Sequence, residues 1–324
     1  MRAVLCESFG GPETLVVREA PTPAPGPGEA LVETAFVGLN FFDTLLIANK
    51  YQFKGAPPFS PGGEFSGRVA ALGAGVEGLR VGERVAGAMT FGAARSHLVV
   101  PAASIVAVPD AVSDEAAAGL VVTYGTTLHG LRQRGELKPG ETLAVLGASG
   151  GVGVAAVEIG AVMGARVIAC ASSSDKLDFC KRHGAAVGID YSTQDLKEAL
   201  KRETGGAGVD VVYDPVGGAY SERALRAMAW KGRFLVVGFA AGEIPRIPLN
   251  LALLKGCDIR GVFWGDFITR EPDAHRANMA QLLDWTAAGK LAVHVHGVWP
   301  FEEVGAAMGE LTGRRAQGKV LLRP

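Results

Sequence analysis

The stretch that decides the fold is residues 143–174, which read LAVLGASGGVGVAAVEIGAVMGARVIACASSS. It opens with a short apolar run over residues 143–146, which predicts a buried strand. A glycine-rich turn over residues 147–153 follows, and then a helical pattern of apolar and small residues that ends at Gly164. Residues 166–171 predict a second strand. This order of strand, glycine turn, helix and strand within about 30 residues is typical of a dinucleotide-binding unit.

The glycines of the turn are spaced for close approach of the backbone to a phosphate. Gly147, Gly150 and Gly153 follow the spacing G-x-x-G-x-x-G, but the strict pattern G-x-G-x-x-G fails because Ala148 takes one glycine position. The first N–H groups of a helix and its positive dipole end attract an anion. We therefore predict pyrophosphate binding by Ser149, Gly150, Gly151, Val152 and Gly153. The alternative is a turn that only packs a helix on a sheet.

The composition of the 324 residues indicates a compact α/β protein and excludes several partners. Charged residues make up 20%, hydrophobic residues 48%, and the formal net charge is -1, so neither nucleic acid nor an anionic membrane surface is indicated. No apolar stretch reaches membrane-spanning length, and the start MRAVLCESFGG does not resemble a signal peptide. The four cysteines form no C-x-x-C pair, so neither a zinc lobe nor a disulfide framework is predicted. We expect a cytoplasmic protein.

The first 114 residues alternate short strands and turns, which predicts a β-barrel-like module. Ser113 then marks the start of a helix, and beyond it strands alternate with helices, which implies a doubly wound parallel sheet. The strands of this sheet are expected at 143–146, 166–171, 186–189, 209–214, 232–239 and 258–262, with a closing helix over 271–291.

Two late strands, at 293–298 and 319–322, are too short and too late to extend the parallel sheet, so we expect them to return to the first module. The length also favours two domains. The predicted organisation is a first domain of residues 1–114, rejoined by residues 289–324, and a Rossmann domain of residues 115–288.

The end of the second strand of the dinucleotide unit indicates which nicotinamide cofactor binds. An NAD site has Asp or Glu there, on the ribose 2′-OH. Here the strand ends in ASSSDK (171–176), whose hydroxyls and lysine suit a 2′-phosphate. We predict NADPH, held by Ser172, Ser173 and Lys176, although Asp175 counts against this choice. The alternative is that these residues only cap the helix at 175–184.

The chain as a whole resembles the medium-chain dehydrogenase/reductase superfamily, and within it the zinc-free quinone oxidoreductases, the ζ-crystallin-like branch. The resemblance covers nearly the full length. It rests on GGPETLVV (10–17), VGLNFFDTLLIANKY (37–51), PGGEFSGRV (61–69), VTYGTTLHGL (122–131), GASGGVG (147–153) and AQGKVLL (316–322). It implies an α/β architecture, with a GroES-like β-barrel catalytic domain beside the Rossmann domain.

The resemblance also bears on metal binding. Zinc-dependent relatives have Cys, His and Cys ligands at positions that correspond here to Asn40, Gly63 and Gly119. Glu64 is present beside the missing histidine, but one carboxylate does not make a zinc site, which needs about three protein ligands. We therefore expect no metal.

The resemblance implies where the nicotinamide site lies. Asn40, Phe41 and Asp43 are expected against the nicotinamide, and the Asn40 amide is a candidate donor near the developing charge; Asp43 is more plainly a structural acid. Some relatives carry a tyrosine where this chain has Leu45, and Tyr51 is the candidate replacement as a proton donor, with packing as its alternative. Further cofactor contacts are expected at Thr123, Tyr191, Val216, Gly238, Phe239, Ala240, Phe263 and Trp264.

These expectations combine into an NADPH-dependent quinone oxidoreductase that transfers a hydride to a quinone or similar conjugated carbonyl acceptor without metal. The alternative enzyme is an enoyl-thioester or alkenal double-bond reductase. The alternative of another class is a non-catalytic NADPH-binding or sensor protein. The resemblance further implies a homodimer that pairs through the edge strand at 258–262.

Overall fold

The computed structural model describes all 324 residues and divides into two compact units. Unit 1 comprises Met1–Val122, Leu283–Gly289 and Val293–Pro324, and unit 2 comprises Thr123–Leu282 and Lys290–Ala292. The division between them falls inside helix α2 (Asp114–His129), whereas the sequence placed a boundary just before this helix. Ser113 begins α2 as expected, because its hydroxyl accepts from the Ala116 N–H at 3.1 Å.

Unit 1 is built on a sheet of seven strands, and the two late strands join it as expected. Its order is β14-β15-β3-β4-β5-β7, with β6 also paired to β3. A separate hairpin pairs β1 with β2. The elements are β1 (Arg2–Cys6), β2 (Leu15–Glu19), β3 (Glu29–Leu39), α1 (Phe41–Ile47), β4 (Glu64–Leu72), β5 (Arg84–Ala88), β6 (His97–Pro101), β7 (Ile105–Ala107), β14 (Val295–Pro300), α10 (Val304–Thr312) and β15 (Lys319–Arg323).

The core of unit 1 lies inside the curved sheet and under α10. β3 and β4 contribute buried residues to it, among them Val32, Val37 and Phe65, all with no exposed surface. β15 closes the sheet by pairing antiparallel with β3, so that Val320 lies opposite Leu39. The C-terminal strand therefore lies directly beside the end of β3, where the segment at 40–43 begins.

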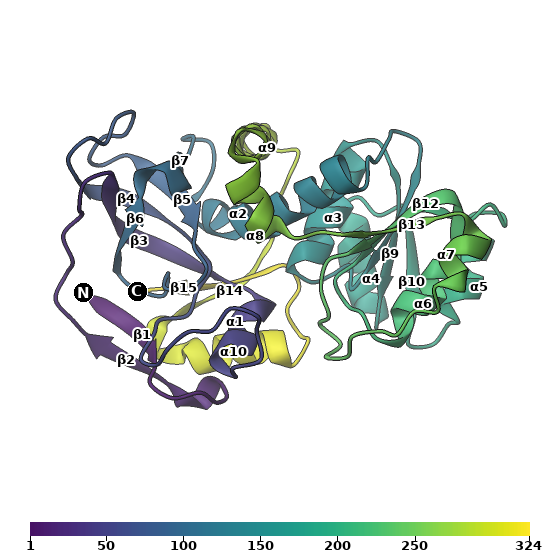
Figure 1. Cartoon of the computed structure of the whole chain (residues 1–324), viewed down its shortest axis with the longest axis horizontal. Coiled ribbons are helices and arrows are strands. Elements are labelled where there is room, and N and C mark those ends of the chain that lie inside the picture. The colour runs from purple at the N-terminus through teal and green to yellow at the C-terminus, as the bar shows by residue number, and fades with distance from the viewer. The chain divides into compact units, whose positions relative to one another are not determined.

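Unit 2 is a parallel sheet of six strands in the order β10-β9-β8-β11-β12-β13, with helices on its faces (Figure 1). This is the order of a Rossmann fold, in which the first and fourth strands are neighbours. The elements are β8 (Thr142–Leu146), α3 (Gly151–Val162), β9 (Arg166–Ala171), α4 (Ser174–Arg182), β10 (Val187–Asp190), α5 (Leu196–Glu203), β11 (Val209–Asp214), α6 (Ala219–Leu225), β12 (Met228–Val236), α7 (Asn250–Lys255), β13 (Asp258–Gly261), α8 (Trp264–Arg270) and α9 (Pro272–Ala287).

Several element ends in unit 2 differ from the sequence prediction; β12, for example, begins at Met228 rather than at residue 232. The strand expected to run to residue 239 ends at Val236, because the N–H groups of Val237 and Gly238 both turn to the carbonyl oxygen of Asp214. The closing helix expected to reach residue 291 ends at Ala287, and Gly289 follows with a φ of 69°. Helices commonly end at such a glycine, which tolerates the left-handed conformation.

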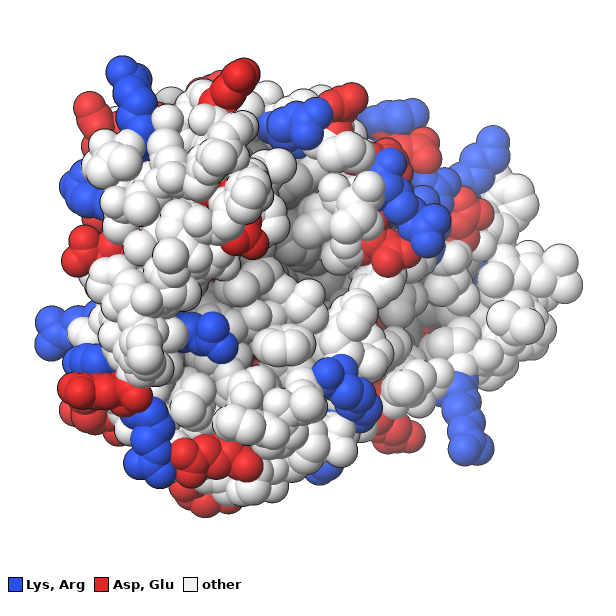
Figure 2. Space-filling model, turned by 60° about the vertical axis from the view of Figure 1, so that its left-hand side comes forward, with Lys and Arg blue, Asp and Glu red and all other residues white.

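The charged residues on the surface agree with the low net charge of the sequence, and the helices agree with the absence of a membrane-spanning stretch in it. On the face drawn in Figure 2, lysines and arginines alternate with acidic residues, and no part of it is a broad field of one sign. None of the helices has both the length and the apolar composition that crossing a membrane requires.

Candidate functional site

The glycine turn of unit 2 joins β8 to α3 at the carboxyl end of the sheet. Gly147 has a φ of 58°, a conformation that favours glycine. A Cβ at Gly153 would collide with the carbonyl oxygen of Gly147, whereas a Cβ at Gly150 would lie 3.5 Å from that oxygen, an ordinary contact. The turn therefore requires glycine at 147 and 153 for its backbone geometry, and Gly150 is less constrained.

The start of α3 is open to an anion. Gly150 is its N-cap, no side chain caps the helix, and the first turn carries no acidic residue. The Val154 N–H donates to the carbonyl of Gly150 at 2.8 Å, so the N–H groups of Gly151, Val152 and Gly153 lie in the first turn, ahead of the regular helical bonds. Such N–H groups and the helix dipole together fit a pyrophosphate. The residues present thus fit a dinucleotide at the turn that the sequence predicted.

A second loop, after β11, lies beside this turn and is held by a buried carboxylate. Asp214 Oδ1 accepts from the N–H groups of Val216 at 2.8 Å and Gly217 at 2.9 Å, and its Oδ2 accepts from the Ser221 hydroxyl at 2.5 Å. Burial raises the pKa of Asp214, and the three hydrogen bonds oppose that rise. Val216 Cγ2 would lie 2.8 Å from a Cβ at Gly147, so the loop packs on the turn. Sequence reasoning found Val216 but missed Asp214.

The end of β9 brings together the residues expected at the 2′-phosphate. Lys176 Nζ donates to the Ser172 hydroxyl at 3.3 Å, and Ser172 is exposed. Ser173 is the N-cap of α4, yet its side chain makes no capping hydrogen bond. Two hydroxyls and an ammonium are therefore grouped after the strand, as a 2′-phosphate site requires. Tyr191, after β10, packs on Tyr220 with ring centroids 4.4 Å apart.

The loops after β12 and β13 hold the remaining residues expected at the cofactor in unit 2. Phe239 packs on Gly217, and the Ala240 N–H donates to the Pro215 carbonyl at 3.0 Å, so the loop that starts at Gly238 is tied to the loop after β11. Phe263 is 47% exposed. Trp264 begins α8, and its buried Nε1 would lie 3.1 Å from a Cβ at Gly125. Thr123 is buried in α2.

A buried ionic cluster, which we define as Asn40, Asp43, Glu64 and Lys319, lies in unit 1 where β3, α1, β4 and β15 meet. Lys319 is 2% exposed and Glu64 is fully buried. Lys319 Nζ donates to Glu64 Oε1 at 2.6 Å, to Asn40 Oδ1 at 3.0 Å and to the carbonyl oxygen of Leu39 at 3.0 Å. Asn40 Nδ2 donates to Glu64 Oε1 at 2.9 Å. The sequence prediction included Asn40 but missed Lys319, which the pattern of β15 gave no reason to single out.

Asp43 is the second carboxylate of the ionic cluster and is also fully buried. It accepts from the N–H groups of Asn40 at 2.8 Å and Gly62 at 2.9 Å. Burial and, to a smaller extent, the charge of Glu64 raise the pKa of Asp43 to about 7, although these two N–H groups and the Lys319 charge lower it. The bond to Asn40 ties Asp43 to the start of α1, which is the structural role that the sequence favoured for it.

Three aromatic rings, one in α1 and two in the loop after it, pack against one another in unit 1. Phe42 stacks on Tyr51 with centroids 5.4 Å apart, and Tyr51 contacts Phe53 at 5.9 Å. Burial raises the pKa of Tyr51, and the charge of Asp43 adds to the rise. Tyr51 therefore lies within a group of packed rings, and its phenol stays protonated at neutral pH. Phe41, the first residue of α1, accepts from the Thr44 hydroxyl at 2.7 Å through its carbonyl oxygen.

The positions that correspond to zinc ligands in relatives are filled differently here. A Cβ at Gly63 would collide with the ring of Phe42, and a Cβ at Gly119 would lie 2.9 Å from Lys319 Cγ. The Asn40 amide is engaged by Lys319 and Glu64. No group of three or more His, Cys, Asp or Glu residues could hold a metal ion. The residues present therefore do not fit a zinc centre.

Unit 2 contains another buried carboxylate that sequence reasoning missed. Glu158, in α3, accepts from the Tyr124 hydroxyl at 2.8 Å, from His183 Nδ1 at 2.5 Å and from the Ala292 N–H at 3.1 Å. It is 4% exposed. Its partners come from α2, from the end of α4 and from the segment at 290–292, so we assign Glu158 a structural role in holding these parts of unit 2 together.

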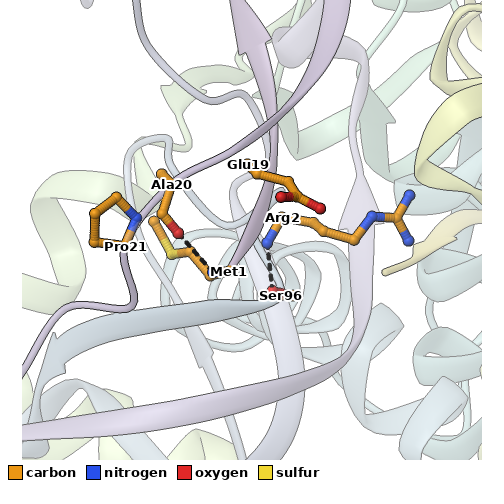
Figure 3. A pocket seen from close by; sticks show the side chains of 6 residues that line it. All are labelled: Met1, Arg2, Glu19, Ala20, Pro21 and Ser96. Carbon is orange, nitrogen blue, oxygen red and sulfur yellow. Dashed lines mark hydrogen bonds between the residues drawn. The ribbon is translucent and has the colours of Figure 1, made fainter.

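A shallow depression of about 450 Å³ lies at the N-terminal hairpin of unit 1 (Figure 3). Its lining includes Met1, whose ammonium donates to the Ala20 carbonyl at 2.6 Å, and Arg2, whose backbone N–H donates to the Ser96 hydroxyl at 2.8 Å. None of the predicted site residues lines it.

Comparison with known proteins supports the fold and identifies the family. The GroES-like domain of alcohol dehydrogenases matches residues 26–110, and the family described as zinc-binding dehydrogenase matches residues 151–287. A rat quinone oxidoreductase-like protein 2 is 37% identical over 322 residues, which is 99% of this chain and 91% of that protein. A quinone oxidoreductase of Pseudomonas aeruginosa is 32% identical and covers 98% of both chains.

Among solved structures, Escherichia coli quinone oxidoreductase, crystallised with NADPH, superimposes with a TM-score of 0.94. It is 30% identical, and all of both chains is covered. The resemblance read from GASGGVG and the other motifs is therefore confirmed. The chain belongs to the medium-chain dehydrogenase/reductase superfamily, in its quinone oxidoreductase branch.

Proposed function

We propose that this protein is an NADPH-dependent reductase that delivers a hydride to a quinone or a similar conjugated carbonyl compound without a metal ion. The observation that carries the proposal is the uncapped start of α3 behind the glycine turn, together with Ser172 and Lys176 at the end of β9. The Escherichia coli relative named above was crystallised with NADPH, which supports the choice of cofactor.

The residues of unit 2 would bind and orient the cofactor. The N–H groups of Gly151, Val152 and Gly153 would hold the pyrophosphate, and Lys176 with Ser172 would neutralise a 2′-phosphate. The nicotinamide, when bound, supplies the hydride. The protein contributes the fixed position of donor and acceptor, which is a large part of the catalysis in such a reaction.

The residues of unit 1 would serve the acceptor. The Asn40 amide is our candidate donor to the acceptor oxygen, on which negative charge develops as the hydride arrives. Tyr51 is our candidate proton donor, because its phenol carries a proton at neutral pH; burial and the charge of Asp43 raise its pKa and so make it a weaker acid than a free phenol. A metal is not part of the proposal, because Phe42 and Lys319 fill the space at Gly63 and Gly119.

Oxidation of NADPH by purified protein tests this function. The acceptors are para-benzoquinone, phenanthrenequinone and crotonyl-CoA, and metal content is measured on the same sample. Turnover with the quinones alone supports the proposal, whereas turnover with crotonyl-CoA alone indicates the double-bond reductase of thioesters. Tight NADPH binding without turnover of any acceptor indicates a non-catalytic binding protein. Stoichiometric zinc would contradict the interpretation of Gly63 and Gly119.

We also propose a second copy of the chain as partner, paired through β13. This strand ends the parallel sheet, so one of its edges has no neighbour, and Ile259 on it is 40% exposed. Further exposed apolar side chains lie on β12, the strand next to β13, and on α7 with the residue before it, namely Trp230, Leu249, Leu253 and Leu254, which are 72–79% exposed. An unpaired edge with apolar neighbours favours pairing with another strand.

Sedimentation of the wild type and of the double variant Leu253→Asp/Leu254→Asp tests the dimer. We expect a dimer for the wild type and a monomer for the variant, because the acids place charge where apolar surface would be buried. A wild-type monomer at micromolar concentration contradicts the proposal. Lys197→Asp, on an exposed helix away from β13, serves as a charge control.

A further inference from the structure

Lys319 is a buried cation whose three N–H donors are all used. They bond to the carbonyl oxygen of Leu39, to Asn40 Oδ1 and to Glu64 Oε1, at 2.6–3.0 Å. Such complete pairing is what makes a buried ammonium tolerable. Lys319 is 2% exposed, so it cannot meet a substrate directly and acts only on its neighbours.

The neighbour that matters for chemistry is the Asn40 amide. Its oxygen accepts from Lys319 and its nitrogen donates to Glu64. An ammonium only donates hydrogen bonds and an ionised carboxylate only accepts them. Rotation of the amide by half a turn would therefore place a donor against a donor and an acceptor against an acceptor. Lys319 and Glu64 together fix which end of the amide is the donor.

The backbone around the cluster leaves room for this arrangement. A Cβ at Gly119 would lie 2.9 Å from Lys319 Cγ, and a Cβ at Gly38 would lie 2.6 Å from Glu64 Cγ. Glu64 Oε2 also accepts from the Val122 N–H at 2.8 Å, so neither of its oxygens is unpaired. The orientation of Asn40 is thus enforced by a fully bonded, closely packed group.

We propose that Lys319 is a positioning residue for the reduction: it holds the Asn40 amide in the one orientation that presents an N–H to the acceptor oxygen. The inference rests on the proposed reductase function. The second hydrogen of Asn40 Nδ2 makes only a long hydrogen bond, 3.5 Å to the Gly38 carbonyl oxygen. In the proposed role, this N–H donates a hydrogen bond to the acceptor oxygen. Lys319 touches neither substrate nor cofactor in this role.

The test compares Lys319→Gln, Glu64→Gln and the double variant. Each single variant leaves one buried charge unpaired, and either one can fail to fold. The double variant removes both charges of the Lys319–Glu64 pair, but glutamine both donates and accepts, so the Asn40 orientation is no longer imposed. We expect the double variant to unfold at a urea concentration closer to wild type than either single variant, with NADPH affinity within about twofold of wild type.

The kcat of the double variant with a quinone should fall by about 10–100-fold, because the variant slows the hydride step. The primary isotope effect with deuterated NADPH as the donor should be larger than in the wild type for the same reason. Arg84→Gln is the matched control: it removes a partly buried ion pair to Asp114 in the same unit, at 2.7 Å, without touching Asn40. It should lower stability and leave kcat and the isotope effect unchanged.

A double variant with kcat within about twofold of wild type overturns the positioning role, because Lys319 is then only the counter-ion of Glu64. Absence of turnover in the wild type with every acceptor overturns the reductase function itself, and this inference with it. The two failures are therefore distinguished by the wild-type measurement.

Discussion

The candidate sites of the two units consist of different chemical groups. Unit 2 uses backbone: a glycine turn and the bare N–H groups at the start of α3. Unit 1 uses side chains: two carboxylates, an amide and one ammonium, all buried. The backbone site depends on the absence of atoms at Gly147 and Gly153, whereas the ionic cluster depends on the presence of every charge. The first should therefore be damaged by added volume and the second by removed charge.

The largest expected effect is loss of the Lys319 charge. Lys319→Met leaves Glu64 buried beside Asn40 with no counter-ion, and breaking a buried pair in this way costs about 3–5 kcal/mol. Urea unfolding of the variant and the wild type measures the loss. A loss below about 1 kcal/mol, the range of exposed ion pairs, would show that water reaches the cluster.

The pH dependence of stability tests the second carboxylate of the cluster. The pKa of Asp43 rises from 3.8 to about 7 in the folded protein, so folding takes up a proton between these values. Stability should then fall as pH rises from about 4 to about 7, with a slope of at most about 1.4 kcal/mol per pH unit. Lys319, Glu64 and Tyr51 are the titratable groups that interact with Asp43.

Urea unfolding across this pH range, on the wild type and on Asp43→Asn, measures that slope. The variant should be less stable throughout, because an amide cannot accept at both of its ends from the Asn40 and Gly62 N–H groups, and its curve should be flatter. Equal slopes for the two proteins would assign the dependence to another group.

Added volume in the glycine turn is the next effect in size. Gly153→Ala places a Cβ against the carbonyl oxygen of Gly147, and overpacking of this kind costs about 1–3 kcal/mol. NADPH binding, followed by the fluorescence of the bound nucleotide, should be lost with it. Gly150→Ala is the matched control for the loss of stability, because its Cβ makes only an ordinary contact within the protein and its φ of -73° suits alanine. Equal losses in both variants would mean that the clash at Gly153 is not the cause.

The smallest expected effect concerns cofactor choice at the exposed end of the backbone site. Ser172→Asp brings a carboxylate beside Lys176 and the site proposed for the 2′-phosphate, so NADPH affinity should fall by about tenfold, or 1.4 kcal/mol, while NADH affinity holds or rises. Titration of each nucleotide with both proteins measures the ratio. An unchanged ratio would remove Ser172 and Lys176 from the 2′-phosphate site.

The two sites also differ in how far the sequence alone reveals them. The glycine turn is encoded within residues 147–153, so spacing predicts both its place and its chemistry. The ionic cluster joins residues from four separate elements, and the contact between Lys319 and Glu64 spans 255 positions. No local pattern indicates such a contact, since Lys319 is one polar residue at the start of an apolar strand. Asp214 and Glu158 were missed for the same reason, because their partners are set by packing.

Element boundaries show a similar limit. The strand expected to end at residue 239 has the apolar composition to continue, and it ends at Val236 only because two N–H groups turn to the Asp214 carbonyl. The doubly wound parallel sheet of unit 2, by contrast, was predicted from the alternation of strands and helices together with the glycine turn. Long-range hydrogen bonds decide where an element stops, and local composition decides that it exists.

The place of Lys319 in the last strand has a consequence for synthesis on the ribosome. Most of unit 2, residues 123–282, lies between Glu64 and Lys319 in the chain, so its six parallel strands are complete before β15 is made. Unit 1 stays incomplete until β15 pairs with β3, and Glu64 lacks its counter-ion Lys319 until then. The order of translation therefore allows unit 2 to fold before unit 1 is complete, and the ionic cluster can form only after β15 has been made.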